Sequence, residues 1–151
     1  MAEDIESFSD MLRQGLGARL DAKAESFVDM VADDVVMEFP YAPPGMATRL
    51  ESKAAIAEHL QELGGMLAFD RMTTSVVHAS TDPEVFILEF TGHGTGVETG
   101  EPYDQQYISV IRLRDGKIAH YRDYWNPLVV LRALRGATVV DALIGKGTDH
   151  G

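Results

Sequence analysis

Residues 103–135 read YDQQYISVIRLRDGKIAHYRDYWNPLVVLRALR and contain the clearest structural signal in the chain. Two runs rich in β-branched and aromatic residues, 103–113 and 117–125, flank an Asp115-Gly116 pair, which is typical of a tight hairpin turn. A helix is expected from Pro127, because proline is favoured in the first turn of a helix. The second run also carries Asp123 among aromatic and basic neighbours, where an acid requires an explanation. We therefore take Asp123 as the candidate catalytic residue.

The composition favours one globular domain, since 151 residues with 45% hydrophobic content can bury a core but are too few for two ordinary domains. The 24 acidic and 13 basic residues give a formal charge of -11, which repels phosphate backbones and anionic lipids. We expect neither a nucleic-acid nor a membrane partner. The chain has no cysteine, its start is acidic where a signal peptide is basic, and no apolar run approaches ~18 residues. These features predict a cytoplasmic protein.

Three helices are predicted before the sheet, because apolar residues recur at intervals of three and four in residues 5–20, 22–31 and 52–63. Ser52 is a suitable N-cap for the third helix, and a Gly64-Gly65 pair ends it. Between the second and third helices, the sequence VVMEF predicts a strand at 35–39, which the proline-rich segment 40–45 stops.

The apolar period then changes to two, which predicts four consecutive strands at 73–79, 84–91, 103–113 and 117–125. We expect the glycine-rich segment 92–100 to connect the second and third of these strands. The result is an α+β fold: a curled antiparallel sheet, three N-terminal helices packed on its concave face, and a short C-terminal helix. We expect a single domain over residues 1–136 and a loosely held tail over 137–151.

This order of elements resembles the nuclear-transport-factor-two-like (NTF2-like) superfamily, which has a cystatin-like cone fold. Its members include ketosteroid isomerase, limonene epoxide hydrolase and the SnoaL-like polyketide cyclases. The sequence EVFILEFTGHGTG at 84–96, together with 103–136, is most similar to SnoaL-like domains of the phenazine-biosynthesis A/B-type branch. The resemblance covers about residues 5–136 and is most specific in the segment GKIxxYRDYxNP. It implies the cone fold, whereas function depends on individual residues.

The superfamily's functional residues are only partly present. The position of the general base in ketosteroid isomerases is Phe39 here, and their oxyanion-hole Asp and Tyr fall near Ser109 and Gly15. The Arg-x-Asp triplet of limonene epoxide hydrolases is missing from residues 85–90. The last-strand acid that transfers protons in phenazine A/B-type proteins matches Asp123. The resemblance thus disfavours steroid and epoxide chemistry and implies proton transfer without a cofactor.

Strand alternation predicts which neighbours accompany Asp123 into the cone. On its own strand we expect inward side chains at Ala119, Tyr121 and Trp125, and outward ones at Ile118, His120, Arg122 and Tyr124. On the adjacent strand we expect inward side chains at Tyr103, Gln105, Tyr107 and Ser109. The candidate substrate-binding residues are Tyr41, His78, Glu89, Gln105, Tyr107, Tyr121 and Trp125. Such a lining suits a small apolar or aromatic molecule, and it raises the pKa of a buried carboxyl group.

Structural roles are the alternatives for these residues. Asp123 could pair with a cation from a helix or a second subunit, and Glu89 could face either the pocket or a subunit interface. His78 and His93 are more often structural histidines than ligands, and no pair of histidines has metal-ligand spacing. The Gly92-x-Gly94-x-Gly96 pattern joins two strands and is not a dinucleotide-binding motif. We expect neither a metal nor a cofactor.

Two functions remain open at this point. One is a SnoaL-like enzyme of the isomerase, cyclase or dehydratase type that acts on a carbonyl-bearing, cyclic or aromatic metabolite. In it Asp123 is the acid and base, while Gln105, Tyr107 and Tyr121 orient the substrate. The other is a non-catalytic ligand-binding or dimeric scaffold domain, so whether the protein is an enzyme stays open. Both predict a homodimer through the exposed sheet face, because Ile108 and Val110 would otherwise form an exposed apolar patch.

Overall fold

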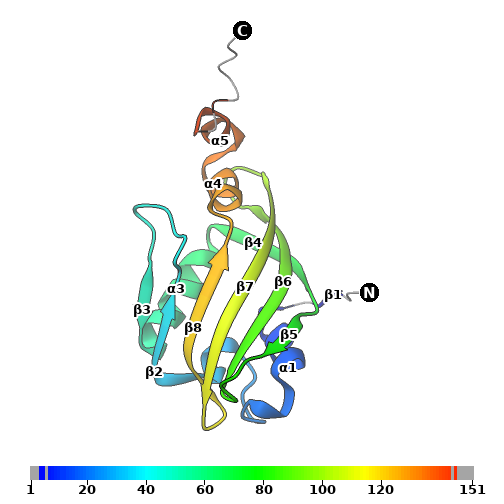
Figure 1. The fold of residues 1–151 in the computed structure, drawn as a ribbon. Helices are drawn as coiled ribbons and strands as arrows, with labels where there is room; N and C mark the ends of the chain where they lie inside the picture. The colour runs from blue at the N-terminus through cyan, green and yellow to red at the C-terminus, as the bar shows by residue number, and fades with distance from the viewer. Residues whose placement is uncertain (1–3, 6, 144, 146–151) are drawn as a thin grey trace.

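The computed structural model describes residues 4–5, 7–143 and 145, and its main feature is a strongly curved sheet (Figure 1). The strands follow the order β1-β4-β6-β7-β8-β2-β3, and β5 pairs with β6 outside this path. All neighbours are antiparallel except β2 and β8, which run parallel. The described strands are β1 (Asp4–Ile5), β2 (Val31–Glu38), β3 (Arg49–Glu51), β4 (Leu67–Thr73), β5 (Val76–Ala79), β6 (Val85–Gly96), β7 (Pro102–Arg114) and β8 (Lys117–Trp125).

Helices cover the concave face of the sheet and one of its ends (Figure 1). The helical elements are α1 (Phe8–Leu16), the 3-10 helix η1 (Gly17–Arg19), α2 (Phe27–Met30), α3 (Lys53–Gly64), α4 (Pro127–Arg135) and α5 (Ala137–Leu143). On α1, Met11, Leu12 and Leu16 are fully buried, so the helix supplies one side of the core. This arrangement confirms the predicted α+β cone. None of the helices within the described residues has the length and apolarity that crossing a membrane requires.

The β7–β8 hairpin forms as predicted. Asp115 and Gly116 both adopt positive φ angles, 54° and 79°, which is the conformation of a two-residue type I′ turn. Arg114 pairs with Lys117 directly beside the turn. The helix predicted from Pro127 is α4, whose first turn is capped by the Asn126 side chain.

A bulge at the start of β8 overturns part of the predicted alternation. Arg112 pairs with His120, whereas its neighbour Leu113 pairs with Ile118, so Ala119 is an extra residue in the ladder. Ile118 is therefore fully buried, and the prediction that it faces outward is wrong. The alternation holds beyond the bulge, where Tyr121 and Asp123 are buried.

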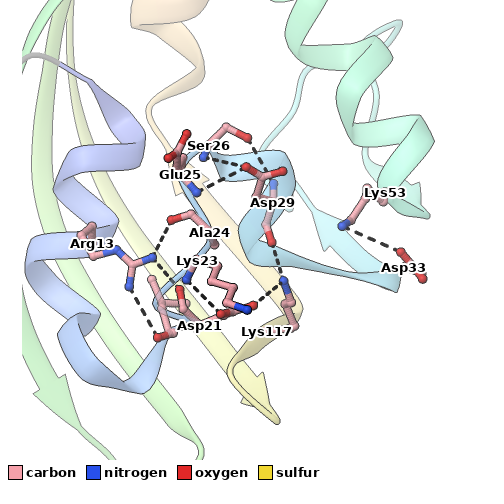
Figure 2. Close-up of polar contacts among 11 residues, drawn as sticks. Arg13, Asp21, Lys23, Ala24, Glu25, Ser26, Asp29, Asp33, Lys53 and Lys117 are labelled. Atoms are coloured by element: carbon pink, nitrogen blue, oxygen red, sulfur yellow. Dashed lines mark hydrogen bonds and ion pairs between the residues drawn. The ribbon is translucent and has the colours of Figure 1, made fainter.

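The second helix is much shorter than predicted. It is the four-residue α2, and β2 begins directly after it at Val31. A capping box starts α2: the Ser26 hydroxyl accepts from the Asp29 amide, and the Asp29 carboxylate accepts from the Ser26 amide (Figure 2). The helix is short because it starts only at the Ser26 cap, while the backbone carbonyls of Asp21 and Ala24 before it are bound by Arg13.

The glycine-rich segment is mostly strand, which corrects the prediction of a connection there. β6 continues to Gly96 and pairs with β4, a strand that the sequence pattern did not predict. A side chain at Gly94 would collide with the carbonyl oxygen of Ala68 on β4, and one at Gly96 with that of Ala133 on α4. These glycines therefore allow close approach of neighbouring backbones. The predicted strand at 73–79 is split between the end of β4 and β5.

Arg13 fixes the segment that connects α1 to α2 (Figure 2). Its guanidinium group donates to the carbonyl oxygens of Asp21 at 2.7 Å and Ala24 at 2.6 Å, with longer contacts to two carbonyls nearer the helix. Lys117, at the start of β8, bridges the Asp21 carboxylate at 3.1 Å and the Asp29 carbonyl at 2.9 Å. These contacts attach the N-terminal segment to the β7–β8 hairpin.

The C-terminal helices α4 and α5 lie beyond one end of the sheet (Figure 1). α5 occupies residues of the expected tail, and its Val140 is buried. Residues 144 and 146–151 of that tail lie outside the described residues.

Candidate active site

A cavity of about 290 Å³ lies between the N-terminal helices and the concave face of the sheet. Its walls are largely apolar and aromatic, with polar groups at only a few positions. The lining residues are Ser7, Phe8, Phe27, Met37, Phe39, His59, Leu60, Leu63, Gly64, Phe69, Met72, Phe90, Tyr107 and Asp123. The volume is close to the lower limit of small-molecule sites, which span ~300–1,000 Å³.

Asp123 is the acid of this cavity. It lies on β8 directly opposite Ser109 of β7, and the Ser109 hydroxyl donates to its Oδ1 at 3.3 Å. Burial raises the pKa of Asp123 to about 8, although the hydrogen bond from Ser109 acts in the opposite direction. At neutral pH the carboxyl group is therefore mostly protonated and able to donate a proton.

His59 contributes a second titratable group to the same cavity. It lies on α3, is partly buried, and has its ring centroid 5.2 Å from that of Phe39. Burial lowers the pKa of His59, and the charge of Glu62 only partly opposes this effect. The imidazole is thus neutral at neutral pH, and a neutral imidazole can accept a proton.

Sequence reasoning did not select His59 as a site residue. A signal for it exists in the helical pattern of α3, because Ile56, His59, Leu60 and Leu63 follow the i, i+3, i+4, i+7 spacing of one helix face. A histidine on the apolar face of a helix that covers a cone is placed to reach the interior.

Tyr107 is the predicted binding residue that lies in the cavity wall. Its ring stacks on Phe90 with centroids 4.8 Å apart, and its hydroxyl is 2.7 Å from that of Tyr103. Burial raises the pKa of Tyr107 well above its ordinary value and that of Tyr103 to about 12. Both phenols stay protonated at neutral pH, so they can donate hydrogen bonds but not act as bases.

Gln105 and Tyr121 point inward as predicted, but neither lines the cavity. The Gln105 side-chain amide donates to the Asn126 carbonyl at 2.9 Å and accepts from the Asn126 amide at 2.8 Å. It extends the β7–β8 ladder by one residue and positions the cap of α4. Tyr121 is fully buried, and its hydroxyl is 2.7 Å from that of Ser109, behind Asp123.

None of the other four predicted binding residues lines the cavity. Tyr41, Glu89 and Trp125 line a second, open groove, which reaches the outer side of the sheet at Glu89 and shares Phe90 and Tyr107 with the cavity. The Trp125 ring itself packs against the core, with its centroid 6.3 Å from that of Phe39 in the cavity wall. His78 Nε2 lies 2.6 Å from Glu89 Oε2, which pairs β5 with β6 on that side. The alternation of β6, with Phe86, Leu88 and Phe90 buried and Glu89 exposed, places Glu89 on the outer face.

The comparisons with known proteins agree with this architecture. A family model described as a SnoaL-like domain matches residues 12–121. The chain belongs to the SnoaL-like family. Its relatives include the "Uncharacterized protein YesE" of Bacillus subtilis, 38% identical over 97% of this chain and 99% of the relative. Another is the "Uncharacterized PhzA/B-like protein PA3332" of Pseudomonas aeruginosa, 40% identical over 80% and 85%.

Solved structures show the same fold as this SnoaL-like domain. A Bacillus subtilis protein named a "putative isomerase" is 41% identical, with a TM-score of 0.73 over 85% of this chain and 92% of its own. A phenazine biosynthesis-related protein from Pseudomonas aeruginosa is 22% identical, with a TM-score of 0.62 over 85% and 83%. The resemblance to SnoaL-like proteins and their phenazine A/B-type branch is thereby confirmed.

The charge of the cavity wall restricts what this SnoaL-like site can bind. The described lining contains neither lysine nor arginine, and its ionisable groups Asp123, His59 and Tyr107 are all shifted toward their neutral forms. Among the described residues, no group of three or more acidic or histidine side chains is arranged to hold a metal ion. The chemistry available to these side chains is hydrogen bonding and proton transfer within an apolar space.

Proposed function

We propose that this SnoaL-like protein is a cofactor-independent enzyme of the isomerase, cyclase or dehydratase type, acting on a carbonyl-bearing cyclic or aromatic metabolite. The observation that carries the proposal is the buried carboxyl group of Asp123, which shares one apolar cavity with the imidazole of His59. Burial shifts the pKa of Asp123 upward and that of His59 downward. An acid that holds its proton and a base that lacks one are the pair needed to move protons at neutral pH.

In the proposed reaction, His59 removes a proton from the carbon next to the substrate carbonyl. The electrons of the broken C–H bond form the enol double bond, and the carbonyl oxygen takes the proton of Asp123. Return of a proton from His59 to another carbon of the conjugated system, with Asp123 regaining its own, completes an isomerisation. The apolar walls exclude water, which strengthens the hydrogen bond to the developing enolate oxygen.

The ligand is proposed to be a small, flat and uncharged molecule. Phe90 and Tyr107 stack on each other in the cavity wall, and an aromatic wall of this kind favours flat, unsaturated rings. A carboxylate or phosphate group would be removed from water in a wall whose described residues include no cation. The Tyr107 hydroxyl can help orient a carbonyl or hydroxyl group.

Deuterium exchange into a model ketone tests the proposed chemistry. The wild-type protein in D₂O should exchange the acidic carbon-bound protons of 2-tetralone faster than buffer, as followed by proton NMR. Asp123→Asn and His59→Gln should each slow this catalysed exchange by about 10²-fold or more, because each removes one proton-transfer group. Binding of the ketone, measured separately by saturation-transfer NMR, should change little.

The matched control is Asp70→Asn, which makes the same chemical change at an exposed residue of β4 outside the cavity. It should keep the wild-type exchange rate. If Asp123→Asn also keeps that rate, Asp123 is not the acid and the proposal fails.

The alternative function is a non-catalytic ligand-binding or scaffold domain. The open groove that reaches the outer face, lined in part by Tyr41, Ile108 and Trp125, is the observation that favours it. Such a protein would bind the ketone, but its exchange rate would equal that in buffer and would not respond to the Asp123 and His59 substitutions.

We also infer a homodimer through the outer face of the sheet. Tyr41, Val76 and Ile108 line the groove on this face and are 58%, 57% and 46% exposed, so association would remove a substantial apolar surface from water. Ile108→Glu should dissociate the dimer in light scattering at micromolar concentration. Val97→Glu, at a similarly exposed position outside the groove, should not. A wild-type protein that scatters as a monomer would rule out the dimer.

A cytoplasmic location completes the proposal. It is supported by a chain of 151 residues without cysteine, a composition that fits a reducing compartment.

A further inference from the structure

Three polar side chains form a continuous chain behind the cavity wall. The Tyr121 hydroxyl lies 2.7 Å from the Ser109 Oγ, and this Oγ lies 3.3 Å from Asp123 Oδ1. Tyr121 and Ser109 are fully buried, whereas Asp123 reaches the cavity. Only the last member of the chain can therefore contact a molecule in the cavity.

The direction of the hydrogen bonds follows from counting protons. Ser109 has one hydroxyl hydrogen, so it donates either to Asp123 or to Tyr121, not to both. Among the described residues, Ser109 is the hydrogen-bond partner that the structure gives to the Tyr121 hydroxyl. If Ser109 donated to Tyr121, the hydroxyl hydrogen of Tyr121 would be buried without an acceptor, which is unfavourable. If Tyr121 donates to Ser109, and Ser109 donates to Asp123, every hydrogen in the chain has an acceptor.

We propose that Tyr121 and Ser109 are positioning residues that direct the acidic proton of Asp123 into the cavity. Because Oδ1 already accepts the Ser109 hydrogen, the neutral carboxyl group carries its proton on Oδ2. The proton is thus held on the oxygen that remains for a substrate carbonyl. Neither residue touches the substrate, and both act through Asp123.

The same chain serves the second half of the proton transfer. When Oδ2 gives up its proton, the bonding electrons remain on Asp123, and the negative charge spreads over both carboxylate oxygens. The Ser109 hydrogen bond to Oδ1 then becomes charge-assisted, and the Tyr121 hydroxyl polarises it further. The pKa of Asp123 agrees with this stabilisation of the carboxylate, because the hydrogen bond from Ser109 lowers the pKa whereas burial raises it.

Carboxyl-¹³C NMR titration of Asp123 in the ligand-free protein tests the inference. Ser109→Ala and Tyr121→Phe should both move the Asp123 midpoint to higher pH, because each weakens stabilisation of the carboxylate. Adding Tyr121→Phe to Ser109→Ala should have no further effect, since Tyr121 acts only through Ser109. The control Tyr103→Phe removes another buried phenol hydroxyl, one that contacts Tyr107 instead of Ser109, and should leave the midpoint unchanged.

The sign of the shift decides the result. In the reverse direction, Asp123 would donate its proton to Ser109, so either substitution would destabilise the neutral acid and lower the midpoint. A lowered midpoint, or a Tyr121→Phe midpoint equal to wild type, overturns the inference. Tyr121→Phe is nearly isosteric, so it decides the question by itself if Ser109→Ala does not fold.

The inference rests on the proposed function only for its effect on turnover. There, Ser109→Ala should lower kcat roughly tenfold with little change in KM, and the loss of rate at high pH should move to higher pH. The titration needs no substrate. A protein that exchanges no ketone protons can thus still show the chain, and an active enzyme can still lack it.

Discussion

Asp123 combines deep burial with the lack of a cationic partner among the described residues, and this has a thermodynamic consequence. Its pKa rises from 3.8 in an unstructured chain to about 8 in the folded protein. Between these values the folded protein binds a proton that the unfolded chain has released. The free energy of unfolding contributed by this group therefore falls as the pH rises from about 4 to about 8.

Asp123→Asn should consequently stabilise the protein at neutral pH. The amide keeps the shape and the acceptor for Ser109 but needs no proton on folding, whereas Asp123 must take one up at pH 7. We expect a gain on the order of a few kcal/mol at pH 7 that vanishes near pH 4. Thermal unfolding followed by circular dichroism at both pH values checks this. A variant less stable than wild type at pH 7 would contradict the raised pKa of Asp123.

The members of the candidate site were predictable to different degrees. Asp123 was found because a period of two and a resemblance to last-strand acids indicate the same residue. His59 was missed because a helix that lies over a cavity has the same apolar pattern as one that lies on a closed core. Gln105 and Tyr121 point inward as predicted, yet alternation cannot tell a cavity wall from the layer behind it. That difference depends on hydrogen bonds to Asn126 and Ser109, which require three-dimensional contacts.

Among the structural elements, β6 depends most on residues that carry no side chain. Gly96→Ala should destabilise the fold by roughly 2 kcal/mol or more, because the new Cβ would collide with the Ala133 carbonyl oxygen and push α4 off the sheet. Chemical denaturation measures the change.

Gly64→Ala is the matched control, since no atom lies within 4 Å of the added methyl group and the residue is helical. It should be neutral or slightly stabilising. Equal losses in both variants would show that close packing is not the cause.

The limits of prediction for the elements have physical causes. The hairpin and α4 were predicted because a type I′ turn and a proline N-terminus are local signals. The bulge at Ala119 has no such signal, and it reverses the facing of Ile118. β4 was missed because its sequence, LAFDRMT, lacks alternation and is interrupted by a register shift near Asp70. The glycine-rich end of β6 was predicted to be a connection. Glycine is required there because the backbones of Ala68 and Ala133 pack closely against it, and the sequence alone does not show these contacts.

For the molecule as a whole, a net charge of -11 and a cavity wall without lysine or arginine among its described residues act in the same direction. We expect 2-naphthol to bind at least tenfold more tightly than 2-naphthoate, which has the same ring system and a negative charge. Fluorescence titration of both compounds checks this expectation.

A designed cation should reduce this preference. Leu60 lines the cavity from α3 and is only partly buried, so Leu60→Lys can place an ammonium group there with its head near water. It should strengthen naphthoate binding, whereas the uncharged control Leu60→Gln should not. Tight binding of naphthoate to the wild-type protein would show that the site accepts anions.

The parallel pairing of β2 with β8 joins an early strand to the last one, and this constrains the order in which the chain can fold. While the protein is being synthesised, β2 and the edge strand β3 have no partner in the main sheet until β8 has emerged. The antiparallel strands β6, β7 and β8 are neighbours in sequence and can assemble first. The cavity then closes last, since Phe39 follows β2 directly and His59 lies on α3, which packs against β2. A nascent chain truncated before β8 therefore has no binding site, although it contains nearly all the residues that line the cavity.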